Sequence, residues 1–202
     1  SIVFDGVDDY ATINQTLSTP ITITGLIKYN NQSQTLNTWI NTYPHTVLGI
    51  SLNRLGNGEL YIYIGNGSYW LATPAIISST NMTINTWYHM TFVSNGSGSQ
   101  LYLNGVSVGT SIHSPSGWGS KFYLGWIEIA TKEYLNGNIA STQIYNRALS
   151  TTEIQQNYLS TFNPKFIFQS NLNIWYDMSL QASTASADNV NTIDVSVSTS
   201  FN

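Results

Sequence analysis

The sequence predicts an all-β protein, a sandwich or jelly roll of two antiparallel sheets, and three observations support this prediction. Up to about residue 147, short segments alternate between apolar and polar residues. Gly, Asn or Pro residues separate these segments, as turns between strands require. A single segment carries the start signals of a helix. Many short strands with close turns are typical of an antiparallel sandwich.

The alternating segments are predicted to be strands because side chains along a strand point to opposite faces in turn. Within residues 58–64 the aliphatic side chains are expected on the buried face, with Tyr61 and Tyr63 on the other. Asn104 and Gly105 predict a two-residue type I′ hairpin, because both turn positions need a positive φ. The predicted strands are residues 20–29, 46–52, 58–64, 86–93, 100–109, 120–127 and 138–146.

One short helix is predicted near residues 150–160. The sequence S-T-T-E begins at Ser150 and forms a capping box, in which Ser150 and Glu153 each accept a hydrogen bond from the other's backbone amide. The helix is expected to end at Leu159 or Ser160, since Pro164 prevents much extension. Its predicted apolar side consists of Ile154, Tyr158 and Leu159. We expect that side to close one end of the sandwich.

The sequence changes in character after Pro164. We interpret residues 1–163 as one domain and residues 164–202 as a C-terminal extension. Residues 172–176 resemble strand material, whereas residues 181–200 are mostly Ser, Thr, Ala, Asp, Asn and Val. The extension is an added strand, a linker or the start of a further repeat, and the sequence leaves these alternatives open.

Composition argues against several classes of function. Only 8% of residues are charged, and six Lys and Arg with a net charge of −4 leave no basic surface for nucleic acid. The apolar runs are far shorter than the roughly 20 residues that span a bilayer, so no membrane insertion is expected. With no Cys, the chain has neither disulfides nor thiol nucleophiles. The neutral surface, rich in Tyr and hydroxyl groups, suits sugars or other neutral polar partners.

Three motifs occur in order along the chain. They are F-D-G-V-D-D-Y at residues 4–10, W-Y-H-M-T-F at 87–92 with L-Y-L-N-G at 101–105, and G-N-I-A at 137–140 with I-Y-N-R-A-L-S at 144–150. Together they resemble the laminin-G-like domains of the concanavalin A-like lectin/glucanase superfamily, over residues 2–158. The resemblance implies a concanavalin A-like jelly roll whose ligands are met at loop ends or on the concave sheet.

Asp5, Asp8 and Asp9 form the acidic cluster of the sequence. Calcium takes six to eight oxygen ligands, so three carboxylates with backbone carbonyls would supply part of a site. The alternative is that Asp5 and Asp8 accept hydrogen bonds from turn amides. Many relatives carry an acidic residue where Ala140 and Ser141 stand here. Ca2+ is therefore a candidate cofactor at the three aspartates, and no other cofactor is predicted.

No catalytic residue is predicted, and the chain is interpreted as a non-enzyme. Glu128 and Glu133 have the spacing of a glucanase glutamate pair, but Ala130 replaces the central Asp of that motif and coincidence is favoured. The pattern G-V-S-V-G around Ser107 matches a nucleophile elbow, yet it lies on the return strand of a hairpin with no helix after it. The His residues lack the spacing of a zinc site, and His89 is expected to be structural.

Aromatic residues in predicted loops are the candidate ligand contacts, because sugar C–H faces stack on Trp and Tyr rings and loops often carry binding residues. The candidates are Trp39, Tyr43, Tyr69, Trp70 and Trp118. The alternative is that these rings cap the ends of the sandwich. Trp87 and Tyr88, in contrast, are predicted to lie in the core.

The sequence predicts a non-catalytic recognition module that binds carbohydrate or another cell-surface receptor, within a larger extracellular or virion-surface protein. No signal peptide is expected within the chain. The alternative is a structural or adhesion subunit that self-associates through exposed strands and the C-terminal tail. A glucanase-like glycoside hydrolase ranks third.

Overall fold

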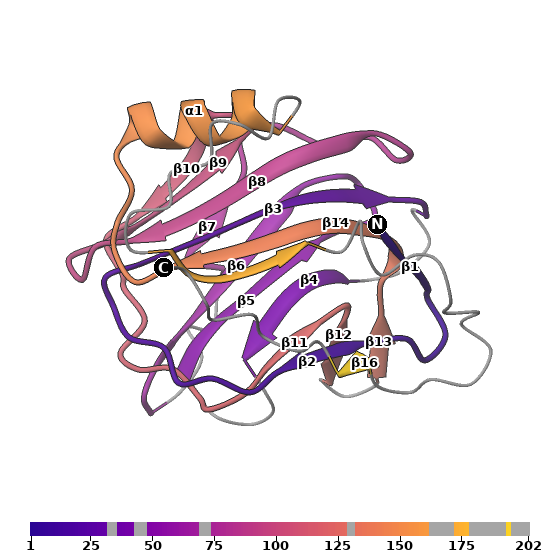
Figure 1. Cartoon of the computed structure of the whole chain (residues 1–202), viewed down its shortest axis with the longest axis horizontal. Coiled ribbons are helices and arrows are strands. Elements are labelled where there is room, and N and C mark those ends of the chain that lie inside the picture. The colour runs from indigo at the N-terminus through magenta and orange to yellow at the C-terminus, as the bar shows by residue number, and fades with distance from the viewer. Residues whose placement is uncertain are drawn as a thin grey trace, which may run out of the picture.

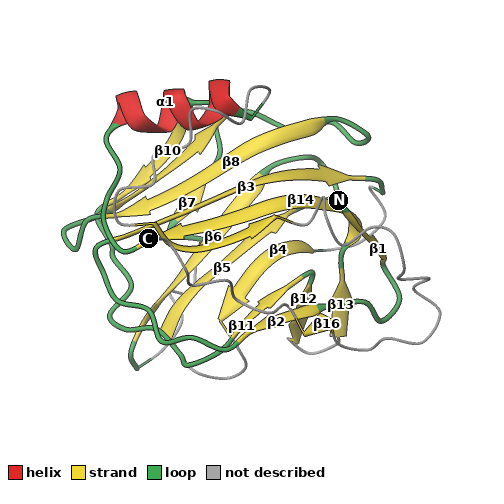
Figure 2. Cartoon of the chain, viewed as in Figure 1, coloured by secondary structure: helices red, strands yellow, loops and turns green. Residues whose placement is uncertain are grey.

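Two large β-sheets stack face to face and one helix lies against the outside of the first sheet (Figures 1 and 2). This arrangement is seen in a computed structural model that describes residues 1–31, 36–42, 48–68, 74–128, 132–161, 172–177 and 193–194. The predicted all-β sandwich with one short helix is confirmed.

The first sheet has the strand order β1-β14-β3-β8-β9-β10, and β15 also pairs with β14. Its strands are β1 (Ile2–Asp5), β3 (Ile21–Tyr29), β8 (Trp87–Ser94), β9 (Ser99–Leu103), β10 (Val106–Ser111), β14 (Asn136–Tyr145) and β15 (Leu172–Asp177). All of these pairings are antiparallel. Neighbours far apart in the chain show that the backbone crosses repeatedly between the sheets.

The second sheet has the order β16-β2-β11-β4-β5-β6-β7, and β12 and β13 form a separate ribbon. The strands are β2 (Ala11–Ile13), β4 (Asn37–Thr42), β5 (Leu48–Arg54), β6 (Leu60–Asn66), β7 (Ile76–Ile77), β11 (Phe122–Leu124), β12 (Trp126–Glu128), β13 (Lys132–Tyr134) and β16 (Ile193–Asp194). Within this sheet, β16 pairs with β2 in parallel.

The core lies between the two sheets and follows the predicted alternation. The aliphatic side chains of β6 are buried, whereas Tyr61 and Tyr63 are half-exposed on its other face. The predicted hairpin is also confirmed, because Asn104 and Gly105 have φ values of 51° and 77° between paired strands. In β6 the local sequence therefore determines which face is apolar.

The helix α1 (Thr151–Ser160) begins at the predicted capping box. It does not close an end of the sandwich. Instead it lies over the outer face of the first sheet, above β8, β9 and β10 (Figure 1). A second small core joins the two, formed by Val93, Tyr102, Tyr145, Leu149 and Ile154.

The predicted apolar side of α1 is wrong at Leu159, which is 65% exposed. Asn157 is buried in its place and its Nδ2 donates to the Tyr145 hydroxyl at 3.2 Å. The reason is that Tyr145, at the end of the preceding strand β14, supplies the partner of Asn157, so a polar side chain is stable on the buried side.

Candidate functional site

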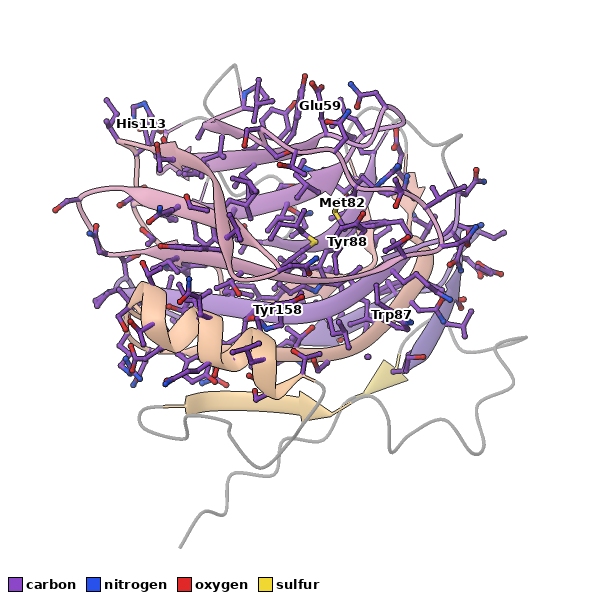
Figure 3. All side chains as sticks on the ribbon, turned by 90° about the horizontal axis from the view of Figure 1, so that it is seen from above. Glu59, Met82, Trp87, Tyr88, His113 and Tyr158 are labelled. Carbon is purple, nitrogen blue, oxygen red and sulfur yellow. The ribbon has the colours of Figure 1, made fainter. Side chains whose placement is uncertain are left out.

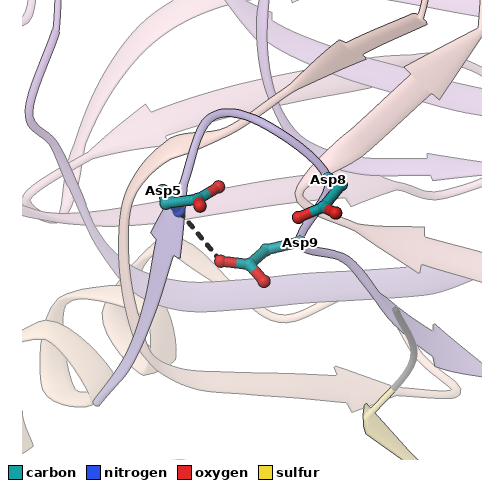
Figure 4. Close-up of side chains that lie close together, drawn as sticks. All are labelled: Asp5, Asp8 and Asp9. Carbon is teal, nitrogen blue, oxygen red and sulfur yellow. Dashed lines mark hydrogen bonds between the residues drawn. The ribbon is translucent and has the colours of Figure 1, made fainter. Parts of the chain in front are cut away.

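The acidic loop joins β1 to β2 and brings the three predicted aspartates together (Figure 4). One carboxylate oxygen from each of Asp5, Asp8 and Asp9 lies within 4.8 Å of the others. Asp9 Oδ2 accepts from the Asp5 amide at 3.0 Å, and Asp5 Oδ1 accepts from the Val7 amide at 2.7 Å. The turn-amide role predicted for Asp5 and Asp8 is thus filled by Asp5 and Asp9.

Electrostatics make this loop receptive to a cation. Burial raises the pKa of Asp9 despite its hydrogen bond from the Asp5 amide, and the negative charges of Asp5 and Asp8 raise it further. An all-oxygen donor set fits calcium, and three carboxylates supply part of the six to eight ligands that calcium takes. These residues could hold the ion with help from backbone carbonyls, and calcium here stays a prediction.

Trp39 is not a loop residue open to ligand, and this prediction is corrected. It lies in β4 with 0% of its surface exposed. Its Nε1 donates to Thr142 Oγ1 at 3.3 Å across the core. Gly25 makes room for the indole, because a Cβ there would lie 2.6 Å from the Trp39 ring. The polar neighbours of Trp39 suggested a loop, but they belong to a buried strand.

Trp118 also packs into the protein, with 7% of its surface exposed. Its Nε1 donates to Thr19 Oγ1 at 3.1 Å and its ring centroid lies 6.0 Å from that of Phe122. Trp118 therefore belongs to the main hydrophobic core and is not a loop ring open to ligand. The other candidates, Tyr43, Tyr69 and Trp70, lie outside the described residues and stay predictions.

Trp87, predicted to be core, is instead 37% exposed. It is the first residue of β8, and its side chain points outward because Tyr88, the next residue, packs against the main core. The Lys28 ammonium lies 5.4 Å from the centroid of the Trp87 ring. Figure 3 labels both aromatic residues among the side chains of this region. Trp87 is thus an accessible indole that sequence reasoning missed.

A groove of about 370 Å³ lies between the start of α1 and the β9–β10 strands. It is lined by Val93, Asn95, Gly98, Ser99, Gln100, Tyr102, Thr110, Ser111, Ala148, Leu149, Ser150 and Thr151. None of these described lining residues carries a charge. Hydroxyl and amide groups are interleaved with a few aliphatic side chains, a composition that fits a neutral polar ligand.

Hydrogen bonds hold the polar groups of the groove in place. The Tyr102 hydroxyl donates to Gln100 Oε1 at 2.8 Å and lies 3.2 Å from Thr151 Oγ1. Gln100 Nε2 in turn donates to Ser107 Oγ at 2.8 Å. The strand β9 is thereby linked to the first turn of α1. Since the lining comes from separate segments, no local pattern in the sequence pointed to this site.

An ion pair between Arg147 and Glu153 lies beside the groove. Arg147 Nη2 lies 2.6 Å from Glu153 Oε1, and Nη1 donates to Oε2 at 3.0 Å. These bonds, with those from Ser150, lower the pKa of Glu153 to about 2. The charged groups face each other beside the groove, so the wall formed by residues 148–151 is held by a bidentate contact.

The pair Glu128 and Glu133 does not have the geometry of a glycosidase. Ile127 lies opposite Glu133, and Glu128 lies opposite Lys132, so the two glutamates occupy opposite faces of the ribbon. Glu133 Oε2 instead accepts a hydrogen bond from the Leu36 amide. A retaining glycosidase needs its two carboxyl groups about 5.5 Å apart across one substrate.

The fold and motifs define the family. A family model described as the concanavalin A-like lectin/glucanases superfamily, of the laminin G type, matches residues 5–155. The chain therefore belongs to this superfamily, as the three motifs indicated. No curated protein sequence matches the chain.

Several solved structures share the fold. A native heptameric SAP-like pentraxin from Limulus polyphemus matches with a TM-score of 0.57 and 19% identity, over 77% of this chain and 80% of the pentraxin. A Bacteroides ovatus protein, provisionally described as carbohydrate binding, gives 0.62 and 18% over 87% and 50%. Botulinum neurotoxin type C gives 0.60 and 14% over 78% and 42%.

Similarity at these identities establishes the fold alone. The chain spans half or less of the matched Bacteroides and neurotoxin chains. Trypanosoma rangeli sialidase, with a TM-score of 0.55 and 17% identity, matches over 80% of this chain and 27% of its own length. In the part of the chain that the structure describes, no helix combines the length and apolar character needed to cross a membrane.

Proposed function

We propose that the chain is a non-catalytic recognition module that binds a neutral carbohydrate in the groove between α1 and the β9–β10 strands. We place it within a larger extracellular or virion-surface protein. The observation that supports this most directly is the lining of that groove, which combines hydroxyls, amides and aliphatic groups without a charge. Its volume of about 370 Å³ falls among those of ligand sites.

The chemistry of the lining matches that of a sugar. Sugar hydroxyls both donate and accept hydrogen bonds, and the exposed side chains of Asn95, Thr110 and Thr151 offer both kinds of group. Ala148, which is half-buried in the lining, provides a small apolar surface for the C–H face of a ring. A site of this size binds weakly by itself, so avidity would come from several copies of the module.

Two relatives agree with this proposal. Cell entry of the matched neurotoxin depends on interaction with two ganglioside molecules, and the Bacteroides protein is provisionally described as carbohydrate binding. A protein that contains this fold therefore engages a carbohydrate-bearing ligand, and that agreement supports the proposal.

A glycan array probed with the full chain tests the proposal. We expect binding to neutral glycans, and a Thr110→Trp variant should bind about tenfold more weakly because the indole fills the groove. Thr80→Trp is the matched control, since Thr80 is exposed and outside the lining. The proposal fails if the folded chain binds no glycan or if Thr110→Trp binds as the parent does.

A chelator arm tests the calcium prediction separately. If Asp5, Asp8 and Asp9 hold an ion that shapes the ligand site, chelation and Asp8→Asn should both weaken glycan binding. If neither chelation nor Asp8→Asn changes glycan binding, the three aspartates do not contribute to the ligand site. Alanine variants of Tyr43, Tyr69 and Trp70 on the same array test the remaining aromatic candidates.

A further inference from the structure

One edge of β14 accepts strands from both ends of the chain. Its other edge is occupied by β3. Along the edge of β14 that faces away from β3, β1 pairs from Asp5 opposite Asn136 to Ile2 opposite Ile139. The strand β15 continues the ladder, with Asp177 opposite Ser141.

The strands β15 and β1 lie end to end in the same direction. Both are antiparallel to β14, and between Ile139 and Ser141 only Ala140 separates their ladders. The last residue of β15 therefore lies next to the beginning of β1, and the arrow of β15 points toward the N-terminus in Figure 1. Two segments from opposite ends of the chain thus form one interrupted strand.

The order in space is the reverse of the order in the sequence. The strand β15 comes after β1 along the chain, yet it occupies the position directly upstream of β1 on the sheet. The β15 strand of one copy therefore has the direction and position needed to pair with β14 directly upstream of β1 in another copy. In the described part of the protein, β15 pairs with β14 and with no other strand.

We propose that residues 141–145 of β14 form a strand-acceptor site that takes Leu172–Asp177 from a second copy of this chain. The ladder is made of backbone hydrogen bonds, so a donated strand restores the same pairing that the chain's own strand makes. Such an exchange changes which copy supplies the strand but not the contacts, which is the low-cost route to assembly known as domain swapping.

Concentration determines which copy fills the site. The chain's own strand is covalently attached and so acts at a high effective concentration, and exchange is therefore favoured when chains fold together in concentrated solution. Reciprocal donation gives a closed dimer, whereas donation in one direction gives a ring or an open row of modules. This inference does not depend on carbohydrate binding.

Cysteine cross-linking tests the exchange, since the chain has no Cys of its own. Full-length Ser141→Cys and Asp177→Cys chains, distinguished by a mass tag on one of them, are unfolded, mixed, refolded at high concentration and oxidised. Directly opposite residues of an antiparallel pair fall within the Cα separation that a disulfide bridges. We expect a mixed dimer, and its mass identifies the two chains.

An off-register mixture provides the control. Leu172 lies opposite Tyr145 rather than Ser141. Leu172→Cys mixed with Ser141→Cys should therefore give about tenfold less mixed dimer, because the sulfurs are too far apart.

A chain carrying both Ser141→Cys and Asp177→Cys reports the pairing within one molecule. The proposal is wrong if this chain closes its internal disulfide while the two single variants form no more mixed dimer than the off-register pair. It is equally wrong if neither cross-link forms, because β15 would then not pair with β14 at all.

Discussion

At the scale of single residues, burial determines the charge of His89. Its Nε2 lies 2.9 Å from Thr24 Oγ1, and the Tyr158 ring centroid is 6.0 Å from that of the imidazole. Nδ1 is buried without a hydrogen-bond partner in the structure as described. Burial lowers the pKa of His89 to about 4, so the imidazole is neutral in the folded protein at neutral pH.

This lowered pKa predicts a loss of stability in mild acid. The unfolded chain binds a proton near the ordinary pKa of 6.5, whereas the folded chain binds it only near 4, so the free energy of unfolding falls as the pH drops through that window. We expect the parent to lose up to about 3 kcal/mol more than His89→Gln across this range, measured by denaturant unfolding.

The titration of Glu153 does not contribute to the change in unfolding free energy above pH 4.5. Its pKa is lowered from 4.5 to about 2, so its stabilising contribution is complete above 4.5 and is lost only below that value. Equal pH profiles of the parent and His89→Gln between 6.5 and 4.5 would contradict the assignment to His89.

Two of the mispredicted tryptophans, Trp39 and Trp87, give a second test. Trp39→Ala removes a fully buried indole and should lower the free energy of unfolding by about 3–5 kcal/mol. Trp87→Ala removes a ring that is 37% exposed and should cost less than Trp39→Ala, about 1–2 kcal/mol including its contact with Lys28. Chemical denaturation measures both, and similar losses would mean that the two burial assignments are wrong.

Sequence reasoning succeeded where a residue's neighbours determine its environment. Tyr61 and Tyr63 alternate with aliphatic residues, so their outward direction follows from the strand period. Trp39 stands among polar residues, and its burial depends on Gly25 of another strand, which no local pattern reveals. Arg54 is likewise buried, with Nη2 donating to the Met82 carbonyl at 2.9 Å from a distant loop.

At the scale of elements, the capping box of α1 could be predicted because all its contacts are local. The Glu153 amide donates to Ser150 Oγ at 3.3 Å and the Ser150 amide donates to Glu153 Oε2 at 2.8 Å. The side on which the helix packs could not be predicted, since the Tyr145 hydroxyl that receives Asn157 belongs to a separate strand.

Removing the cap of α1 should lower the stability of the helix and of the groove wall that its first turn forms. Ser150→Ala is expected to cost about 1 kcal/mol of unfolding free energy, because it leaves the Glu153 amide without its acceptor. Thr152→Ala serves as the control, since Thr152 is exposed in the same turn. Denaturant midpoints provide the measurement, and equal effects of the two variants would count against the cap.

At the scale of the whole molecule, the architecture could be predicted but the groove could not. Period-two segments and the Asn104–Gly105 turn indicate many antiparallel strands whatever their order. The groove requires Gln100, Thr110 and Thr151 to meet, and that depends on where a helix settles on a sheet. Separation along the chain hides such a meeting from any local pattern.

The end-to-end placement of β15 and β1 predicts that their order can be changed. We expect a chain in which residues 172–177 are joined directly before Ser1, and which ends at residue 161, to fold. It should be at least as stable as residues 1–177 in their natural order, because the strand is then continuous with β1 and needs no separate loop closure. Denaturant unfolding compares the two. A clear loss of stability relative to residues 1–177 would refute continuity of the strand, and a chain with the six residues scrambled controls for added length.

The uncharged groove also has a consequence for the solutions in which the protein works. Mobile ions screen forces between charges, but they act little on contacts between hydroxyls, amides and hydrocarbon. A ligand held by this lining should have the same dissociation constant at low and at high salt concentration. Recognition by this domain would then be independent of ionic strength.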